Sequence, residues 1–123
     1  MKQEDKKLLY IDLCARLPYN VIVHIHDLDV IDYDNYLYVE TLAKFESNDV
    51  TLKPYLRPLS SMTEDEREYF EGLSDMKCTL GYAMVKVNFC LKRHLDINGL
   101  IPKGLAIEVT EENNPYNREN SVK

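Results

Sequence analysis

The segment 53–66, which reads Lys-Pro-Tyr-Leu-Arg-Pro-Leu-Ser-Ser-Met-Thr-Glu-Asp-Glu, constrains the fold more than any other part of the chain. Pro54 and Pro58 exclude a helix here and disfavour a central strand, because proline lacks the amide hydrogen that both structures use. Thr63 precedes Glu66 by three residues, which is the spacing of a capping box. We therefore expect an extended connector that ends just after Thr63, where a capped helix begins.

Upstream of this connector, the hydrophobic pattern predicts one helix followed by short strands. Leu9 and Leu13 repeat at helical spacing, with Cys14 beside them as a small core residue, and Pro18 ends the helix. Asp12 and Arg16 face away from this stripe and are expected to form a surface ion pair. The expected elements are a helix over 4–16 and strands over 21–26, 36–45 and 50–53, with an acidic turn over 27–35. The connections are too short for parallel crossovers, which favours an antiparallel meander.

Downstream, the pattern predicts two helices and a final strand. The expected elements are helices over 64–73 and 80–95, a turn over 101–104 and a strand over 105–109. Met84, Val87, Leu91 and Leu95 form the apolar stripe of the second helix, and Gly99 offers it a left-handed stop. The predicted fold is α+β: an N-terminal helix, a three-stranded antiparallel meander, two helices and a C-terminal strand that joins the sheet. We expect one domain over 1–109 and a flexible tail over 110–123.

Composition argues against several classes of function. The chain has 123 residues, 45% of them apolar, and a formal net charge of −6. This charge makes nucleic acid an unfavourable partner, because phosphate contacts need clustered Lys and Arg. A nucleic-acid-binding modulator remains an alternative, and it would use Lys53, Arg57, Lys92 and Arg93.

The cysteines and the apolar segments indicate a reduced, soluble protein. The three cysteines, Cys14, Cys78 and Cys90, are widely spaced, which does not match a zinc or redox motif. Cys78 is the thiol expected to be exposed. No apolar run has the length of a signal peptide core or a membrane span, so we expect a cytoplasmic protein with no membrane partner.

Three sequence blocks resemble a known family. They are Asp-Leu-Cys-Ala-Arg-Leu-Pro-Tyr at 12–19, the connector 53–66, and Gly-Leu-Ile-Pro-Lys-Gly-Leu-Ala-Ile-Glu at 99–108. Together and in this order they resemble short uncharacterised proteins of gut anaerobic bacteria and their phages and mobile elements. Members carry a Trp and a His pair where this chain has Phe89 and Arg93-His94. The resemblance implies a biological setting and no catalytic residues.

His24 and His26 are the candidate metal ligands. At i and i+2 of a strand they point the same way, and with a carboxylate they could bind Zn²⁺. The run is reminiscent of the His-x-His-x-Asp-His motif of metallo-hydrolases, but Leu28 and Asp29 occupy the last two ligand positions. A metal-dependent enzyme that uses His24 and His26 is therefore an alternative to a solvent-facing strand that ends in a polar turn.

The acidic, tyrosine-rich segment 27–40 is the better functional candidate. Its residues of interest are Asp27, Asp29, Asp32, Asp34, Tyr33, Tyr36 and Tyr38. The segment lacks the glycine and the ligand alternation of an EF-hand loop, so we expect a charged hairpin tip. Tyrosines are enriched in recognition surfaces, and Tyr36 and Tyr38 alternate with Leu37 and Val39. They are either exposed beside the acidic loop or packed beneath a helix with their hydroxyls at solvent.

The sequence does not predict an enzyme. It has no nucleophile elbow, phosphate loop or dinucleotide fingerprint, and only four glycines with which to build one. We expect a non-enzymatic protein-interaction module without a cofactor, such as an accessory factor of a phage or mobile element. Its protein partner would bind the segment 27–40, and its oligomeric state is open.

Overall fold

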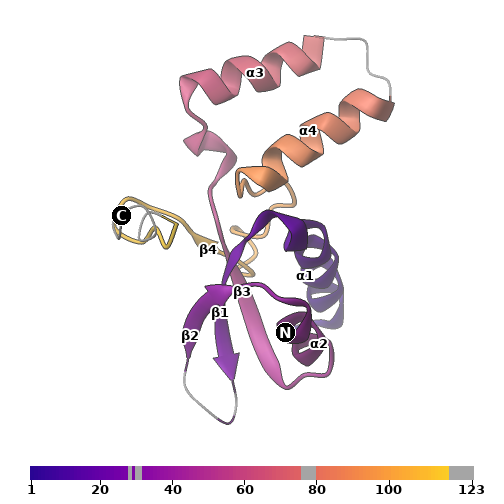
Figure 1. The fold of residues 1–123 in the computed structure, drawn as a ribbon, viewed down its shortest axis with the longest axis vertical. Helices are drawn as coiled ribbons and strands as arrows, with labels where there is room; N and C mark the ends of the chain where they lie inside the picture. Colours follow the sequence, from indigo (N-terminus) through magenta and orange to yellow (C-terminus); the bar gives the residue numbers. More distant parts are fainter. Residues whose placement is uncertain (28, 30–31, 76–79, 117–123) are drawn as a thin grey trace.

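The computed structural model describes residues 1–27, 29, 32–75 and 80–116. These residues form four α-helices and a four-stranded mixed sheet, which confirms the α+β class and the N-terminal helix (Figure 1). The helices are α1 (Gln3–Arg16), α2 (Val39–Glu46), α3 (Glu64–Asp75) and α4 (Leu80–Lys92). The strands are β1 (Ile22–Asp27), β2 (Tyr33–Tyr36), β3 (Val50–Leu56) and β4 (Ile107–Glu108). Short 3-10 turns follow α1 at Leu17–Tyr19 and precede α3 at Leu59–Ser61.

The sheet is not the predicted meander. Its order is β2-β1-β3-β4, with β1 antiparallel to both β2 and β3, and with β4 parallel to β3. The strand predicted over 36–45 is wrong, because β2 ends at Tyr36 and α2 follows. Leu42 and Phe45, which are 7% and 2% exposed, bury one face of α2 at helical spacing. Helix α2 takes the chain past β1, so β3 pairs with β1 and not with β2.

The prediction that the prolines disfavour a central strand is also wrong, since β3 runs through Pro54. Pro54 lies opposite Val23 of β1, whereas β4 pairs with β3 only at Tyr55 and Leu56. The outer edge of β3 has no strand partner at Pro54 among the described residues. A missing amide hydrogen on that edge removes no ladder bond, which is the setting in which strands tolerate proline.

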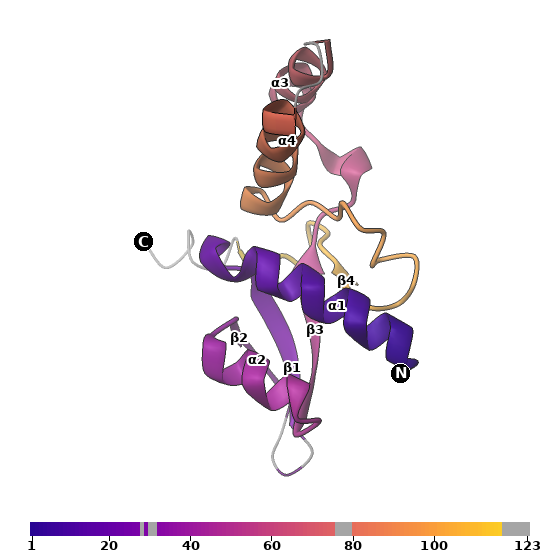
Figure 2. The same cartoon turned by 90° about the vertical axis from the view of Figure 1, so that its right-hand side faces the viewer.

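Helices α1 and α2 cover one face of the sheet (Figures 1 and 2). The core is formed by fully or nearly fully buried side chains of both helices and of β1 and β3. They include Leu9, Leu13, Leu42, Phe45, Val23, Ile25, Val50 and Leu52. The predicted helix over 4–16 is thus confirmed, but Cys14 is exposed and is not part of this core. Pro18 does end the helix, although Leu17 keeps helical dihedral angles in the 3-10 turn.

The expected surface ion pair of α1 is buried instead. Arg16 donates through Nε to Asp12 at 2.5 Å and through Nη2 to the Leu95 carbonyl oxygen at 2.8 Å. Asn98 donates to the second Asp12 oxygen at 2.7 Å, and both charged side chains are 0% exposed. Leu95 and Asn98, in the loop that follows α4, cover this end of α1 beside the leucine stripe. The pair therefore joins the first and last thirds of the chain.

The blocks that carry the family resemblance meet at this joint. The first block supplies the buried ion pair. Arg57, from the second block, exchanges backbone hydrogen bonds with His94 and Asp96 at 2.8 and 2.9 Å. The Asp96 carboxylate accepts from the amides of Leu100 and Ile101 in the third block at 2.8 and 2.9 Å. These residues hold the architecture together.

Helices α3 and α4 form a hairpin that projects away from the sheet (Figure 1). The capping box is confirmed: the Glu66 amide donates to the Thr63 hydroxyl at 3.2 Å, and the Thr63 amide donates to the Glu66 carboxylate at 2.9 Å. Helix α4 ends at Lys92, earlier than predicted. Its left-handed stop is His94, with φ of 61°, and not Gly99.

The C-terminal segment packs onto the sheet beyond the expected boundary at residue 109. Tyr116 accepts a hydrogen bond from the Ile22 amide at 3.0 Å and donates one to the Tyr55 carbonyl oxygen at 2.8 Å. Its ring stacks on His94 with centroids 4.1 Å apart. Burial lowers the pKa of His94 to about 4, so this ring is neutral at physiological pH. The domain's contacts thus extend through Tyr116, and the rest of the expected tail, 117–123, lies outside the described residues.

Candidate functional site

The sheet face opposite α1 and α2 gathers the polar side chains that the sequence singled out. In the sheet register His24 of β1 lies between Asp34 of β2 and Lys53 of β3. Strand alternation places His26 on the same face, as the sequence predicted, and the His26 side chain is 52% exposed. We call this surface, with Tyr55 of β3, the open face.

A continuous hydrogen-bond network crosses the open face. The Tyr55 hydroxyl donates to the Asp34 carboxylate at 2.9 Å. His24 contacts Asp34 through Nδ1 at 2.8 Å and Asp32 through Nε2 at 3.3 Å. His26 hydrogen-bonds the other Asp32 oxygen through Nδ1. Two imidazoles and one phenol therefore hold two carboxylates in place at the end of the β1–β2 hairpin.

Hydrogen bonds within this network stabilise the charged forms of His24 and Asp32. Burial lowers the pKa of His24, but its hydrogen bonds to Asp34 and Asp32 outweigh burial, so that its pKa is raised above the usual value. Hydrogen bonds with His26 and His24 lower the pKa of Asp32. Asp32 is consequently an anion throughout the physiological range.

The open face contains a shallow hollow of about 380 Å³. Its lining combines the network with the outer part of the sheet: His24, His26, Asp32, Thr51, Lys53 and Ile107. Within the described part of the chain, no group of three or more His, Cys, Asp or Glu side chains is placed to hold a metal ion. Both nitrogens of His24 face carboxylates, Asp34 through Nδ1 and Asp32 through Nε2. Leu28, at the expected Asp position of the hydrolase motif, lies outside the described residues.

The structure separates the candidate tyrosines. Tyr36 shares the open face with Asp34, because alternate residues of β2 point the same way. Tyr33, 43% exposed, is on the opposite face of the same strand. Tyr38, 50% exposed, precedes the first turn of α2. Val39 is 64% exposed, so the predicted alternation of buried and exposed residues ends at Leu37.

The remaining acidic candidates are Asp27, the last residue of β1, and Asp29, in the turn that follows it. The Asp29 amide donates to the Asp27 carboxylate at 3.0 Å, and Asp29 is exposed. Together with Asp32 and Asp34 they give this end of the molecule a negative surface. We call the seven residues Asp27, Asp29, Asp32, Tyr33, Asp34, Tyr36 and Tyr38 the acidic end.

Two of the four basic residues considered for nucleic-acid binding, Arg57 and Arg93, pair with Glu66. Arg57 donates to both carboxylate oxygens of Glu66, at 2.6 and 3.1 Å, and Arg93 pairs with Glu66 at 3.3 Å. Lys53 lies on the open face, across the sheet from Asp34. These cations therefore do not form a single basic surface.

Sequence reasoning missed the exposed apolar surface of the α3–α4 hairpin. Met84 and Val87, predicted to lie in a buried stripe, are 58% and 44% exposed, and Val85 is 41% exposed. Only the C-terminal half of the stripe is covered, with Leu91 and Leu95 at 4% and 0%. The helical spacing of these apolar residues is visible in the sequence, but it does not show which of them another part of the chain covers. Cys90 is buried, and Cys78 lies outside the described residues.

Comparison with known proteins gives no match from which a function could be inferred. No protein-family model matches the chain, and neither the curated proteins nor the solved structures contain a significant match to it. Among the described helices, none has the length and apolar character needed to cross a membrane.

Proposed function

We propose that this protein is a non-enzymatic protein-interaction module that binds a basic segment of a partner protein through its acidic end. The observation that carries the proposal is the fixation of Asp32 and Asp34 by His24, His26 and Tyr55 on a sheet face that α1 and α2 leave uncovered. Carboxylates that are already held in position lose little side-chain entropy on binding.

The tyrosines supply the apolar part of such a contact. Tyr33 and Tyr36 lie on the two faces of β2, and β2 is the edge strand of the sheet. A segment that docks along this edge can therefore contact both rings and the Asp34 carboxylate between them. Aromatic anchors next to charged groups are typical of protein-recognition surfaces.

The backbone of β2 adds a second element of recognition. The Leu37 amide donates to the Val21 carbonyl oxygen at 2.9 Å, so alternate residues of the strand face β1 and the intervening residue Asp34 directs its backbone groups outward. An extended partner segment could pair there, as in β-strand addition. The resemblance to proteins of phages and mobile elements supports an accessory role, with a host or phage protein as the partner.

Capture of partners from host lysate, with and without phage infection, tests the proposal. Tyr33→Ala combined with Tyr36→Ala, and Asp29→Asn combined with Asp32→Asn, should each weaken capture about tenfold or more. The matched control is Glu111→Gln with Glu112→Gln, which removes the same charge from exposed positions between β4 and Tyr116.

Salt and folding complete the test. Capture by the wild type should fall as salt rises, since the contact is between charges. Circular dichroism should show that every variant is folded. Capture that the acidic-end variants leave undiminished, or that the Glu111 and Glu112 control reduces equally, would contradict the proposal.

A further inference from the structure

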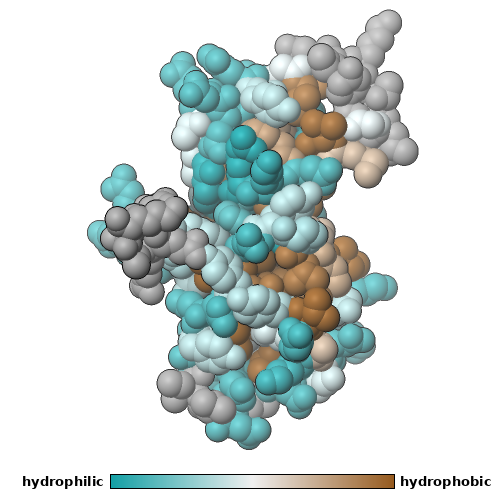
Figure 3. All heavy atoms as spheres, viewed as in Figure 1, coloured by the Kyte–Doolittle hydropathy of each residue, from teal (hydrophilic) through white to brown (hydrophobic). Residues whose placement is uncertain are grey.

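We propose that the α3–α4 hairpin is a self-association surface, on which two copies of this chain form a four-helix arrangement. The first observation is an apolar stripe that the chain leaves uncovered: Met84 and Val87 are 58% and 44% exposed, one helical turn apart on α4. Figure 3 shows hydrophobic side chains on the exposed side of α4. The inference is independent of the acidic end, which lies on the sheet.

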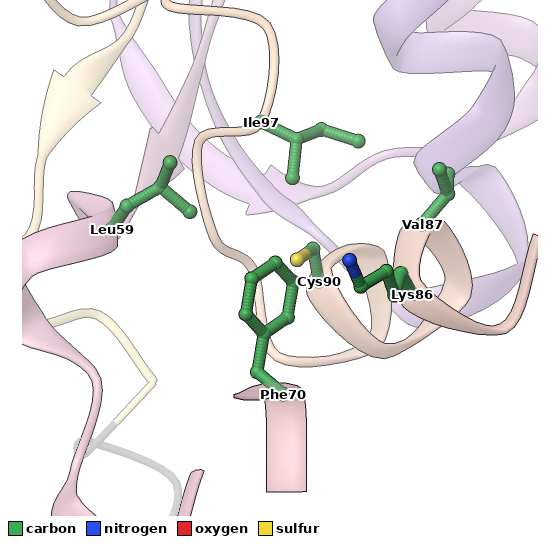
Figure 4. Close-up of a pocket in the computed structure, with 6 residues that line it drawn as sticks. All are labelled: Leu59, Phe70, Lys86, Val87, Cys90 and Ile97. Atoms are coloured by element: carbon green, nitrogen blue, oxygen red, sulfur yellow. The ribbon is translucent and has the colours of Figure 1, made fainter. Parts of the chain in front are cut away.

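Two shallow hollows flank this stripe and share Val87. One, of about 230 Å³, is lined by Leu59, Phe70, Lys86, Val87, Cys90 and Ile97 (Figure 4). The other, of about 300 Å³, is lined by Ala83, Met84, Val87 and Asn88. Val87 thus forms a ridge between two grooves, and helices pack by fitting the ridges of one into the grooves of the other.

The charges of the hairpin identify the occupant as a second copy. The exposed charges of α3 are mostly acidic, and they include Glu64, Asp65, Glu68 and Glu71. Helix α4 has no acidic residue and carries Lys86 and Lys92. A surface with one acidic and one basic helix is complementary to itself, as an interface with two-fold symmetry requires.

The direction of the helices fixes how the copies align. The start of α3 lies beside the end of α4, since Glu66 pairs with Arg93, so Glu68 and Lys92 both lie on the half of the hairpin that adjoins this pair. Two hairpins that point the same way, related by a two-fold axis along their length, bring α3 of each copy beside α4 of the other at matching heights. Every neighbouring pair of helices is then antiparallel, as in up-and-down four-helix bundles.

Mass in solution is the first test. Sedimentation equilibrium of the full chain, over a range of concentrations, should give twice the chain mass of 14.4 kDa at the upper end. Met84→Glu and Val87→Glu should each reduce the mass to that of one chain. Val39→Glu, at a position 64% exposed on α2, introduces the same charge elsewhere and should leave the dimer intact.

A charge exchange tests the alignment. Glu68→Lys with Glu71→Lys places two cations of α3 opposite the lysines of the partner's α4, and Lys86→Glu with Lys92→Glu makes both helices acidic, so each variant alone should be monomeric. Mixed together, the two variants should form a heterodimer. Circular dichroism of each variant verifies the fold.

Three results would overturn the inference. The first is a folded wild type that is monomeric at every concentration, and the second is a dimer that survives Val87→Glu. The third is a monomeric wild type whose α4 stripe retains a different protein that Val87→Glu releases, since this would assign the stripe to another partner.

Discussion

The α/β body, which consists of α1, α2 and the sheet, differs from the α3–α4 hairpin in how completely it buries its apolar side chains. In the body, α1 and α2 cover the sheet, and Leu9, Leu13 and Leu52 are 0% exposed. In the hairpin, α4 buries only the residues next to the body and leaves Met84 and Val87 at solvent. A helix whose apolar period runs beyond its own cover indicates a surface used between molecules. The body thus covers the apolar faces of its helices, whereas the hairpin leaves part of its apolar stripe exposed.

The largest effect should come from the buried ion pair of the body. Asp12→Ala leaves Arg16 without its carboxylate and removes the acceptor of Asn98. Loss of one partner of a buried pair costs about 3–5 kcal/mol, because the other charge stays buried. We expect this loss in the free energy of unfolding, measured by urea denaturation.

Two further variants sharpen this comparison. Asp12→Leu combined with Arg16→Met removes both charges and should destabilise much less than Asp12→Ala alone. Met84→Ala on the hairpin, measured at a concentration where copies are separate, should change stability by less than about 0.5 kcal/mol. Equal losses at Asp12 and Met84 would contradict the division between a covered body and an open hairpin.

Acid should weaken the connection between the two regions. Hydrogen bonds from Arg57 lower the pKa of Glu66 to about 2, against the opposing effect of burial. A carboxyl with a lowered pKa stabilises the fold above its unfolded pKa, and this contribution is lost as pH falls from about 4.5 towards 2. The shift corresponds to roughly 3 kcal/mol at neutral pH. Glu66→Gln should flatten the pH dependence of stability in this window, and Glu64→Gln, exposed on the same helix, should not.

Local signals account for what the sequence predicted correctly. The helix that became α1 follows from leucine spacing, and the start of α3 follows from the pairing of Thr63 and Glu66. Strand alternation alone placed His24 and His26 on one face. Each of these depends on residues within a few positions of one another.

Long-range contacts account for what the sequence did not reveal. The local pattern predicts a strand over 36–45, but residues 39–45 belong to helix α2, which packs against α1 and β3. Arg16 is buried because it reaches Leu95, 79 positions away. Asp32 and Asp34 approach the histidines only because β2 pairs with β1, which the predicted turn did not include. The sequence thus identified the candidate residues of the acidic end, but not their arrangement.

The C-terminal segment offers a smaller test of where the body ends. Tyr116→Phe removes the bonds to the Ile22 amide and the Tyr55 carbonyl oxygen, and leaves the Ile22 amide without that acceptor. We expect a loss of about 1–2 kcal/mol in the free energy of unfolding. The exposed Tyr38 serves as the control, since Tyr38→Phe should be neutral. An unchanged stability for Tyr116→Phe would return the boundary of the body to residue 109.

The smallest effect concerns the charges of the acidic end. The pKa of His24 is raised by Asp34 and Asp32 in the folded state, so its contribution to stability is complete below the unfolded value and is lost as pH rises through the raised pKa. Asp34→Asn should lower the pKa of His24, measured by NMR titration of its ring protons. The accompanying loss of stability should stay below ~1 kcal/mol, because the pair is open to solvent. Asp29→Asn removes a neighbouring charge that the network does not include, and it should leave the titration of His24 nearly unchanged. If both variants shift the pKa of His24 equally, the carboxylates act on His24 only through their overall negative charge and not through specific hydrogen bonds. The acidic end would then lack the fixed geometry that distinguishes it from the rest of the negative surface.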